Sequence, residues 1–129
     1  MPKMLDSSAL LAFCLGETGA AHVASCLKAG ASACTVNLSE AIAVLVRKGM
    51  PAEEATRAIS RLPLEPVDFD VNLAAIAGEM IAMTKIAGLS LGDRACLAAA
   101  RHSGDTAVTA DRVWQTLAAT IGVTVEVIR

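Results

Sequence analysis

The sequence is poor in aromatic residues and lacks a long hydrophobic run, and each absence excludes a class of function. Its aromatic side chains are Phe13, Phe69 and Trp114 alone, so we do not expect a platform on which nucleic-acid bases stack. Hydrophobic residues make up 54% of the chain, yet no segment reaches the ~18 uninterrupted apolar residues of a membrane span. The first apolar run, 9–15, is short and follows Asp6, which does not fit a secretory signal. We therefore expect a cytoplasmic protein that does not enter a membrane.

Several short enzyme motifs are also missing. No GxxxxGK[ST], GxGxxG or HExxH segment occurs, so the nucleotide-binding and zincin motifs are absent. The chain has four cysteines, which are Cys14, Cys26, Cys34 and Cys96. Because they have no CxxC spacing and lie among apolar residues, we interpret them as small buried hydrophobic residues, not as disulfides or a zinc site. His22 and His102 share no motif and are not expected to bind metal.

The chain also lacks an excess of positive charge. It has 11 basic and 13 acidic residues, a formal net charge of −2, which argues against nucleic-acid binding by bulk positive charge. If four of the acids held a metal ion, the basic residues would outnumber the remaining acids by two, and the ion would add positive charge locally. The net charge therefore does not exclude a polyanionic substrate.

The predicted elements alternate between strands and helices. Strands are predicted at 2–6, 31–36, 64–69 and 123–128, with a further short strand after the turn at 104–105 that ends at Asp111. Helices are predicted at 9–13, 19–29, 41–48, 51–62, 71–86 and 112–117, with an Ala-rich helix whose first turn contains Asp93. Pro66 and the alternation of 123–128 place those two strands near sheet edges. This alternation predicts one α/β domain over 1–129, with a mostly parallel sheet of about five strands flanked by helices.

Four acids lie at the ends of these elements. They are Asp6, Glu40, Asp93 and Asp111. Because the carboxyl ends of parallel strands meet at one sheet edge, we expect these acids to share one cleft. Carboxylates that lie close together repel one another, and a divalent cation would remove the repulsion. Oxygen ligands without a neighbouring His or Cys favour Mg²⁺ or Mn²⁺ over zinc, and such an ion typically supports phosphodiester hydrolysis.

Three of the four acids, taken alone, also have a structural explanation. Ser90-x-x-Asp93 matches a capping box, and Asn37-x-x-Glu40 is a plausible cap pair. Asp6 could simply precede a helix that Ser7 or Ser8 caps. The set of four acids is therefore more specific than any member of it.

Four segments together resemble a known family. They are Asp6-Ser7-Ser8-Ala9-Leu10, Asn37-x-x-Glu40, Leu91-Gly92-Asp93-Arg94-Ala95 and Thr109-Ala110-Asp111-Arg112-x-Trp114. In this order they resemble the motifs of PIN-domain ribonucleases and, more narrowly, of the VapC toxins of bacterial toxin–antitoxin pairs. The resemblance implies a Mg²⁺- or Mn²⁺-dependent endoribonuclease that is inhibited by a cognate VapB-type antitoxin and usually forms a homodimer.

The resemblance also assigns roles to individual residues. It implies that the acidic metal site consists of Asp6, Glu40, Asp93 and Asp111. Thr109 and either Ser7 or Ser8 are candidates for orienting carboxylates or water by hydrogen bonds. Arg94 and Arg112 are candidates for contacting substrate phosphate. Trp114 is expected in the core.

Two other classes of function stay open. A receiver domain would require further acids just before the first strand. A haloacid-dehalogenase-like phosphatase would require an Asp at the position of Ser8. A catalytically silent PIN-like module could instead use its acids structurally and bind a protein partner. Retention of all four acids argues against that module, because unpaired buried carboxylates cost several kcal/mol.

Overall fold

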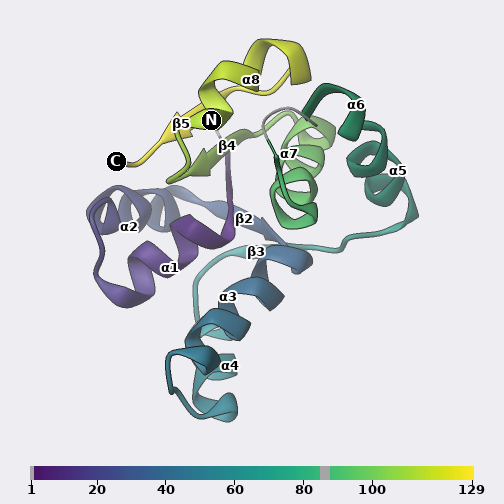
Figure 1. Ribbon diagram of the computed structural model, residues 1–129. Coiled ribbons are helices and arrows are strands. Elements are labelled where there is room, and N and C mark those ends of the chain that lie inside the picture. Colours follow the sequence, from purple (N-terminus) through teal and green to yellow (C-terminus); the bar gives the residue numbers. More distant parts are fainter. Residues whose placement is uncertain (1, 85–87) are drawn as a thin grey trace.

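The computed structural model describes residues 2–84 and 88–129, and these form one central sheet covered by helices (Figure 1). The strands are β1 (Lys3–Leu5), β2 (Ala31–Cys34), β3 (Glu65–Val67), β4 (Thr106–Thr109) and β5 (Val125–Val127). Their order across the sheet is β3-β2-β1-β4-β5, and all four neighbouring pairs are parallel. The predicted α/β fold with a parallel sheet of about five strands is confirmed.

The helices occupy the connections between the strands. They are α1 (Ser7–Leu15), α2 (Ala20–Ala29), α3 (Thr35–Arg47), α4 (Ala52–Ser60), α5 (Val71–Glu79), α6 (Ile81–Thr84), α7 (Leu91–Ser103) and α8 (Val113–Ile121). None of the described helices is by itself long and apolar enough to cross a membrane. One pair, α1 and α2, passes that length and composition test together, with a bend of 109° between them.

The strand order reverses around β1, and this positions the candidate site. From β1 the chain adds β2 and β3 on one side, then returns to place β4 and β5 on the other. Ligands of open α/β sheets bind beyond the carboxyl ends of the strands at such a reversal. Asp6 directly follows β1 at that point.

Alternating residues of the sheet face two separate hydrophobic clusters. Met4 and Ala107 lie in a cluster with α5, α7 and α8, whereas Leu5 and Val108 lie in a cluster with α1, α2, α3 and α4. Figure 1 shows α1 and α2 on one side of the sheet and α5 and α7 on the other. In α7 the run 95–100 is completely buried, which its small Ala side chains permit because neighbouring elements can approach closely. This buried helix presents its N-terminus to the same edge as Asp6.

The beginning of α3 differs from the sequence prediction. The predicted strand 31–36 ends at Cys34, where its pairing with Val67 of β3 ends, and the helix starts at once with Thr35. Glu40 therefore lies in the second turn of α3 and not in the first turn of a helix over 41–48. The length of β3 decides this boundary, and the β-branched character of the local sequence does not.

The predicted helix 71–86 is also wrong as one element. It is divided at Met80 into α5 and α6, and Ile86 lies outside the described residues. Met80 is fully buried, and its carbonyl oxygen accepts hydrogen bonds from the Thr84 backbone N–H at 3.0 Å and hydroxyl at 2.9 Å. The Thr84 hydroxyl competes with backbone donors for this carbonyl, as Ser and Thr do when they bend helices.

Both edge strands are where the sequence places them. β3 carries Pro66 and lies at one edge, and β5 lies at the other. The strand predicted at 123–128 is shorter, however, and all three residues of β5 are half-buried. Its side chains therefore do not divide into a buried face and a solvent-exposed face.

Candidate active site

Asp6 is the most strongly held of the four predicted acids. It is the N-cap of α1, where its Oδ1 accepts a hydrogen bond from the Ala9 backbone N–H at 2.8 Å. Ser8 Oγ donates to the same Oδ1 at 2.7 Å, and Thr109 Oγ1 donates to Oδ2 at 2.6 Å. The expectation that Ser7 or Ser8 caps this helix is thus wrong. A carboxylate accepts an N-terminal N–H at least as well as a hydroxyl does, and Asp6 already stands at the end of β1.

The two hydroxyls that bind Asp6 also hold the loop after β4. Ser8 Oγ accepts from the Ala110 backbone N–H at 2.9 Å, and Thr109 Oγ1 accepts from the Asp111 backbone N–H at 3.0 Å. Each hydroxyl therefore receives a backbone hydrogen bond from the loop and passes one to the carboxylate. Through this network Asp6 connects the ends of β1 and β4. The hydrogen bonds fix the position of its carboxylate.

Burial dominates the protonation of Asp6. Only 3% of this residue is exposed, and burial raises its pKa to about 6 from an ordinary 3.8. Hydrogen bonds from Thr109, Ser8 and the Ala9 N–H lower the pKa, and the negative charge of Asp93 raises it again. Asp93 is thus close enough to Asp6 for the two carboxylates to repel.

Glu40 reaches the same region from α3. Its Oε1 accepts a hydrogen bond at 3.2 Å from Nδ2 of Asn37, which also donates to the carbonyl oxygen of Gly92 at 3.0 Å. The Glu40 carboxylate lies against Gly92 in the space that a Cβ would fill. Asn37 and Glu40 therefore form a side-chain pair inside α3, not the helix cap that the sequence suggested.

Asp93 does form the predicted capping box. Its Oδ2 accepts from the Ser90 backbone N–H at 2.9 Å, and Ser90 Oγ accepts from the Asp93 N–H at 3.2 Å. Asp93 thus caps α7 and also lies near Asp6.

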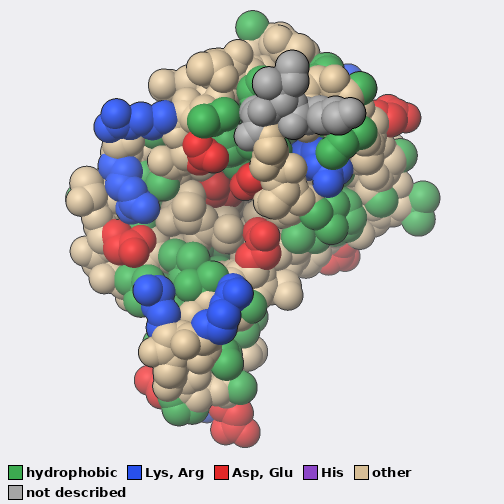
Figure 2. All heavy atoms as spheres, viewed as in Figure 1, with side chains coloured by type: hydrophobic (Ala, Val, Ile, Leu, Met, Phe, Trp, Pro, Cys, Tyr) green, Lys and Arg blue, Asp and Glu red, His purple; other side chains and the backbone are tan. Residues whose placement is uncertain are grey.

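A buried thiol lies within electrostatic reach of three of the acids. Burial, as the largest cause, raises the pKa of Cys96 well above its ordinary value, and Asp6, Asp93 and Glu40 all raise it further. Cys96 belongs to the buried run of α7. Figure 2 shows acidic side chains near the middle of this face, with Lys and Arg side chains toward its margins.

Asp111 joins this group less directly. Its Oδ1 accepts from the Val113 backbone N–H at 3.0 Å, and its own N–H is bound to Thr109. In residues 2–84 and 88–129, no three of the four acids bring carboxylate oxygens within 4.8 Å of one another. The structure thus brings Asp6, Glu40 and Asp93 within electrostatic reach of Cys96 and links Asp111 to Asp6 through Thr109.

The sequence matches the family model of the PIN domain over residues 3–119. The chain belongs to the PIN domain family. No curated protein shows a significant match to it.

Solved structures with this fold include three bacterial proteins. VapBC2 from Rickettsia felis, bound to a promoter DNA fragment, is 17% identical with a TM-score of 0.77 and 100% of both chains covered. DNA-bound VapBC from Salmonella typhimurium is 18% identical with a TM-score of 0.75, covering 100% of this chain and 99% of that chain. VapC20 from Mycobacterium tuberculosis, described as a Sarcin-Ricin loop cleaving toxin, is 20% identical with a TM-score of 0.73, covering 88% and 93%. These similarities show a shared fold.

The donor atoms of this PIN domain fit a hard divalent cation. Oδ1 of Asp6 accepts two hydrogen bonds and Oδ2 accepts one, so Oδ2 keeps a free lone pair. Asn37 Oδ1 is buried without a hydrogen-bond partner among the described residues, beside the Glu40 carboxylate. Carboxylate and amide oxygens are the ligands that Mg²⁺ and Mn²⁺ prefer.

The other sequence candidates divide into two groups. Thr109 and Ser8 contact Asp6, whereas Ser7 takes no part in this network within the described part of the chain. Arg94 Nη1 donates to the Ala77 carbonyl at 2.8 Å, and Arg112 Nε donates to the Arg129 carbonyl at 3.0 Å. Both arginines therefore bind the protein's own backbone.

Trp114 is completely buried in the core cluster, as predicted. Gly92 is the residue that sequence reasoning missed. The signal for it was a glycine in the first turn of a helix, directly before the acid Asp93.

Proposed function

We propose that this PIN domain is a Mg²⁺- or Mn²⁺-dependent endoribonuclease and the toxin of a type II toxin–antitoxin pair. The observation that carries the proposal is Asp6, an acid only 3% exposed at the carboxyl end of the central strand. A buried carboxylate that stays charged beside another acid is unfavourable unless a cation neutralises it. Such perturbed acids at a sheet edge are typical of functional sites.

The four carboxylates would hold the cation. Asp6 would bind it from the end of β1, Glu40 and Asp93 from α3 and α7, and Asp111 from the loop after β4. A divalent cation there would supply an activated water and stabilise negative charge on a phosphoryl oxygen. The resemblance to PIN-domain ribonucleases implies a divalent metal ion, and the oxygen-only donor set favours Mg²⁺ or Mn²⁺.

The protein's own groups prepare this chemistry. Thr109 and Ser8 hold the Asp6 carboxylate in one orientation by donating to its two oxygens. Asn37 orients Glu40 in the same way. Because these partners are fixed by backbone hydrogen bonds, little reorganisation is needed when substrate binds. Arg112, exposed near Asp111, remains a candidate for contacting the RNA phosphate.

The proposed partners follow from the similar structures. Two of them are VapBC assemblies, so we propose a VapB-type antitoxin as the inhibitor of this chain. VapC20 is described as cleaving the Sarcin-Ricin loop, which supports RNA as the substrate class. We also propose a cytoplasmic homodimer. A stable monomer at micromolar concentration in light scattering would contradict the dimer.

The deciding experiment compares two aspartates that cap helices in the same way. Asp6→Asn should reduce cleavage of a structured RNA at least about 100-fold, because a metal ligand is lost. Asp70→Asn is the control, since Asp70 Oδ1 caps α5 by accepting from the Leu73 N–H at 2.9 Å and takes no part in the hydrogen-bond network of Asp6. EDTA should stop wild-type cleavage, and Mn²⁺ should restore it. Wild-type activity in Asp6→Asn, or activity indifferent to EDTA, would overturn the proposal.

A catalytically silent PIN-like module is the alternative, and it predicts no cleavage by any variant. A phosphoacceptor function is less consistent with the structure. Its aspartate would need exposed oxygens to attack phosphorus, whereas Asp6 is buried and accepts three hydrogen bonds.

A further inference from the structure

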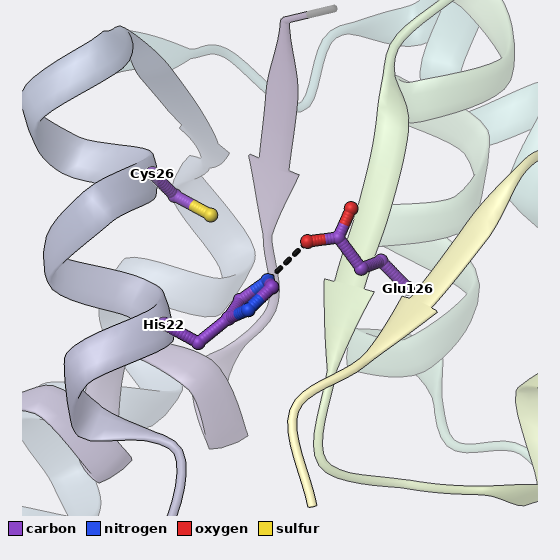
Figure 3. A group of neighbouring side chains, drawn as sticks. All are labelled: His22, Cys26 and Glu126. Carbon is purple, nitrogen blue, oxygen red and sulfur yellow. Dashed lines mark hydrogen bonds and ion pairs between the residues drawn. The ribbon is translucent and has the colours of Figure 1, made fainter.

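A second group of metal-ligating side chains lies away from the four acids. His22 and Cys26 project from one face of α2 toward Glu126 of β5 (Figure 3). Their ligand atoms all lie within 4.8 Å of one another. In residues 2–84 and 88–129 this is the only group of three His, Cys, Asp or Glu side chains that meets this criterion.

The geometry points to a Zn²⁺ site formed by His22 Nε2, Cys26 Sγ and one carboxylate oxygen of Glu126. His22 and Cys26 are four positions apart on one helix, so they lie one above the other on the same face. Bond lengths to Zn²⁺ are roughly 2.0–2.3 Å, so small side-chain rotations bring all three atoms to one ion, with a solvent molecule as the fourth ligand. The imidazole and thiolate ligands select zinc over Mg²⁺.

Lys3 of β1 prepares the carboxylate for this role. Its ammonium binds Glu126 Oε2, while His22 contacts Oε1. Each Glu126 oxygen thus has a different partner, Lys3 for Oε2 and His22 for Oε1. Oε1 is therefore the oxygen that faces the other two proposed ligands. An outer partner that orients a ligating carboxylate in this way is a common feature of metal sites. The ion would replace the direct His22–Glu126 contact and leave the Lys3 contact in place.

Access and charge are consistent with binding from solvent. The His22 side chain is 43% exposed and that of Glu126 27%, whereas Cys26 is buried behind them. Burial, followed by the charge of Glu126, raises the pKa of the Cys26 thiol, so the free protein holds a thiol there. Binding of Zn²⁺ would form the Zn–S bond and release the thiol proton to solvent.

The ion would link the edge strand β5 to α2. β5 has only three residues, and the chain beyond it packs Ile128 against Gly19 just before α2. Arg129 Nη1 donates to the Thr18 carbonyl in the same region at 2.9 Å. A bond through Glu126 would add to these contacts and hold the edge strand in place.

The test is a titration of the metal-free protein with Co²⁺, followed by Zn²⁺. We expect one equivalent of Co²⁺ to produce a thiolate-to-Co²⁺ charge-transfer absorption that Zn²⁺ abolishes and excess Mg²⁺ leaves unchanged. Cys26→Ser should lose this absorption, and Cys14→Ser should keep it, because Cys14 is a half-buried thiol on α1 outside the cluster. Glu126→Gln should weaken Zn²⁺ binding at least about tenfold.

His22→Ala keeps the test decisive if Cys26→Ser does not fold, because His22 is exposed. It should bind Zn²⁺ at least about tenfold more weakly, and Zn²⁺ should raise the thermal midpoint of the wild type but not of this variant. A wild type without the thiolate absorption, or an absorption retained by Cys26→Ser, would show an ion-pair cluster only. Unchanged Zn²⁺ affinity in His22→Ala would overturn the site equally. RNA cleavage is not a readout, so these outcomes are independent of the proposed nuclease.

Discussion

The carboxylate of Glu40 on α3 occupies the space beside Gly92 on α7 that the first side-chain carbon of any other residue would need. Asn37 secures this arrangement by donating to both Glu40 and the Gly92 carbonyl. The first turn of α7 therefore carries an acid, Asp93, directly after a residue that must lack a side chain. Two of the proposed ligands depend on this close approach of two helices.

Gly92→Ala should displace Glu40 and reduce RNA cleavage by at least about 100-fold, with the fold retained. Gly92 has an ordinary helical backbone, so the clash with Glu40 is the cause and not backbone strain. The matched control is Gly78→Ala in α5, where a Cβ would meet nothing within 4 Å. That variant should keep its activity and gain up to about 1 kcal/mol in free energy of unfolding. Equal activities of the two variants would contradict the placement of Glu40 in the site.

Much of this arrangement could be predicted from the sequence, because its causes are local. Small strands between amphipathic helices predict a parallel sheet, Pro66 predicts an edge, and Ser90 with Asp93 predicts a capping box. Each of these signals depends on residues a few positions apart.

The parts that could not be predicted depend on distant partners. The start of α3 is set by where pairing with β3 ends, although Thr35 and Val36 favour an extended strand. The contact between Asn37 and Gly92 joins residues 55 positions apart. His22 and Glu126, 104 positions apart, have no meaning as a pair until the sheet is formed. Cys26 therefore resembled an ordinary buried hydrophobic residue.

The pH dependence of stability should report the buried state of Asp6. Its folded pKa of about 6 lies above the ordinary 3.8, so its favourable contribution is complete below pH 3.8 and is lost as the pH rises through 6. With chelator present, the free energy of unfolding of Asp6→Asn should rise relative to that of the wild type by up to about 3 kcal/mol between pH 4 and pH 7. Urea unfolding of both proteins at several pH values measures this difference. A difference that stays constant with pH would contradict the burial of an ionisable Asp6.

Arg94 should prove to stabilise the fold and not to bind phosphate. Its hydrogen bond to the Ala77 carbonyl joins α7 to α5. Arg94→Met should therefore lower the free energy of unfolding by about 1.5–3 kcal/mol, with little change in the KM for RNA. Arg101→Met, at an exposed position of the same helix, serves as the control for loss of one positive charge. A large rise in KM for Arg94→Met alone, together with unchanged stability, would instead assign Arg94 to the substrate.

Thr109→Val tests whether the network around Asp6 positions it for reaction. Valine has nearly the same shape, but it removes the donor to Asp6 Oδ2 and the acceptor of the Asp111 N–H. We expect a loss of about 1–3 kcal/mol in free energy of unfolding, because the buried Asp6 Oδ2 loses its donor. Cleavage should fall about 10–100-fold, with the apparent affinity for Mg²⁺ falling in parallel.

The control is Thr106→Val in the same strand. Thr106 is also buried, but its hydroxyl takes no part in the Asp6 network. A purely structural role for Thr109 would lower the stability of Thr109→Val while leaving its Mg²⁺ affinity equal to that of Thr106→Val. Weaker Mg²⁺ binding in Thr109→Val alone would show that this hydroxyl acts through the two acids that it contacts, Asp6 and Asp111.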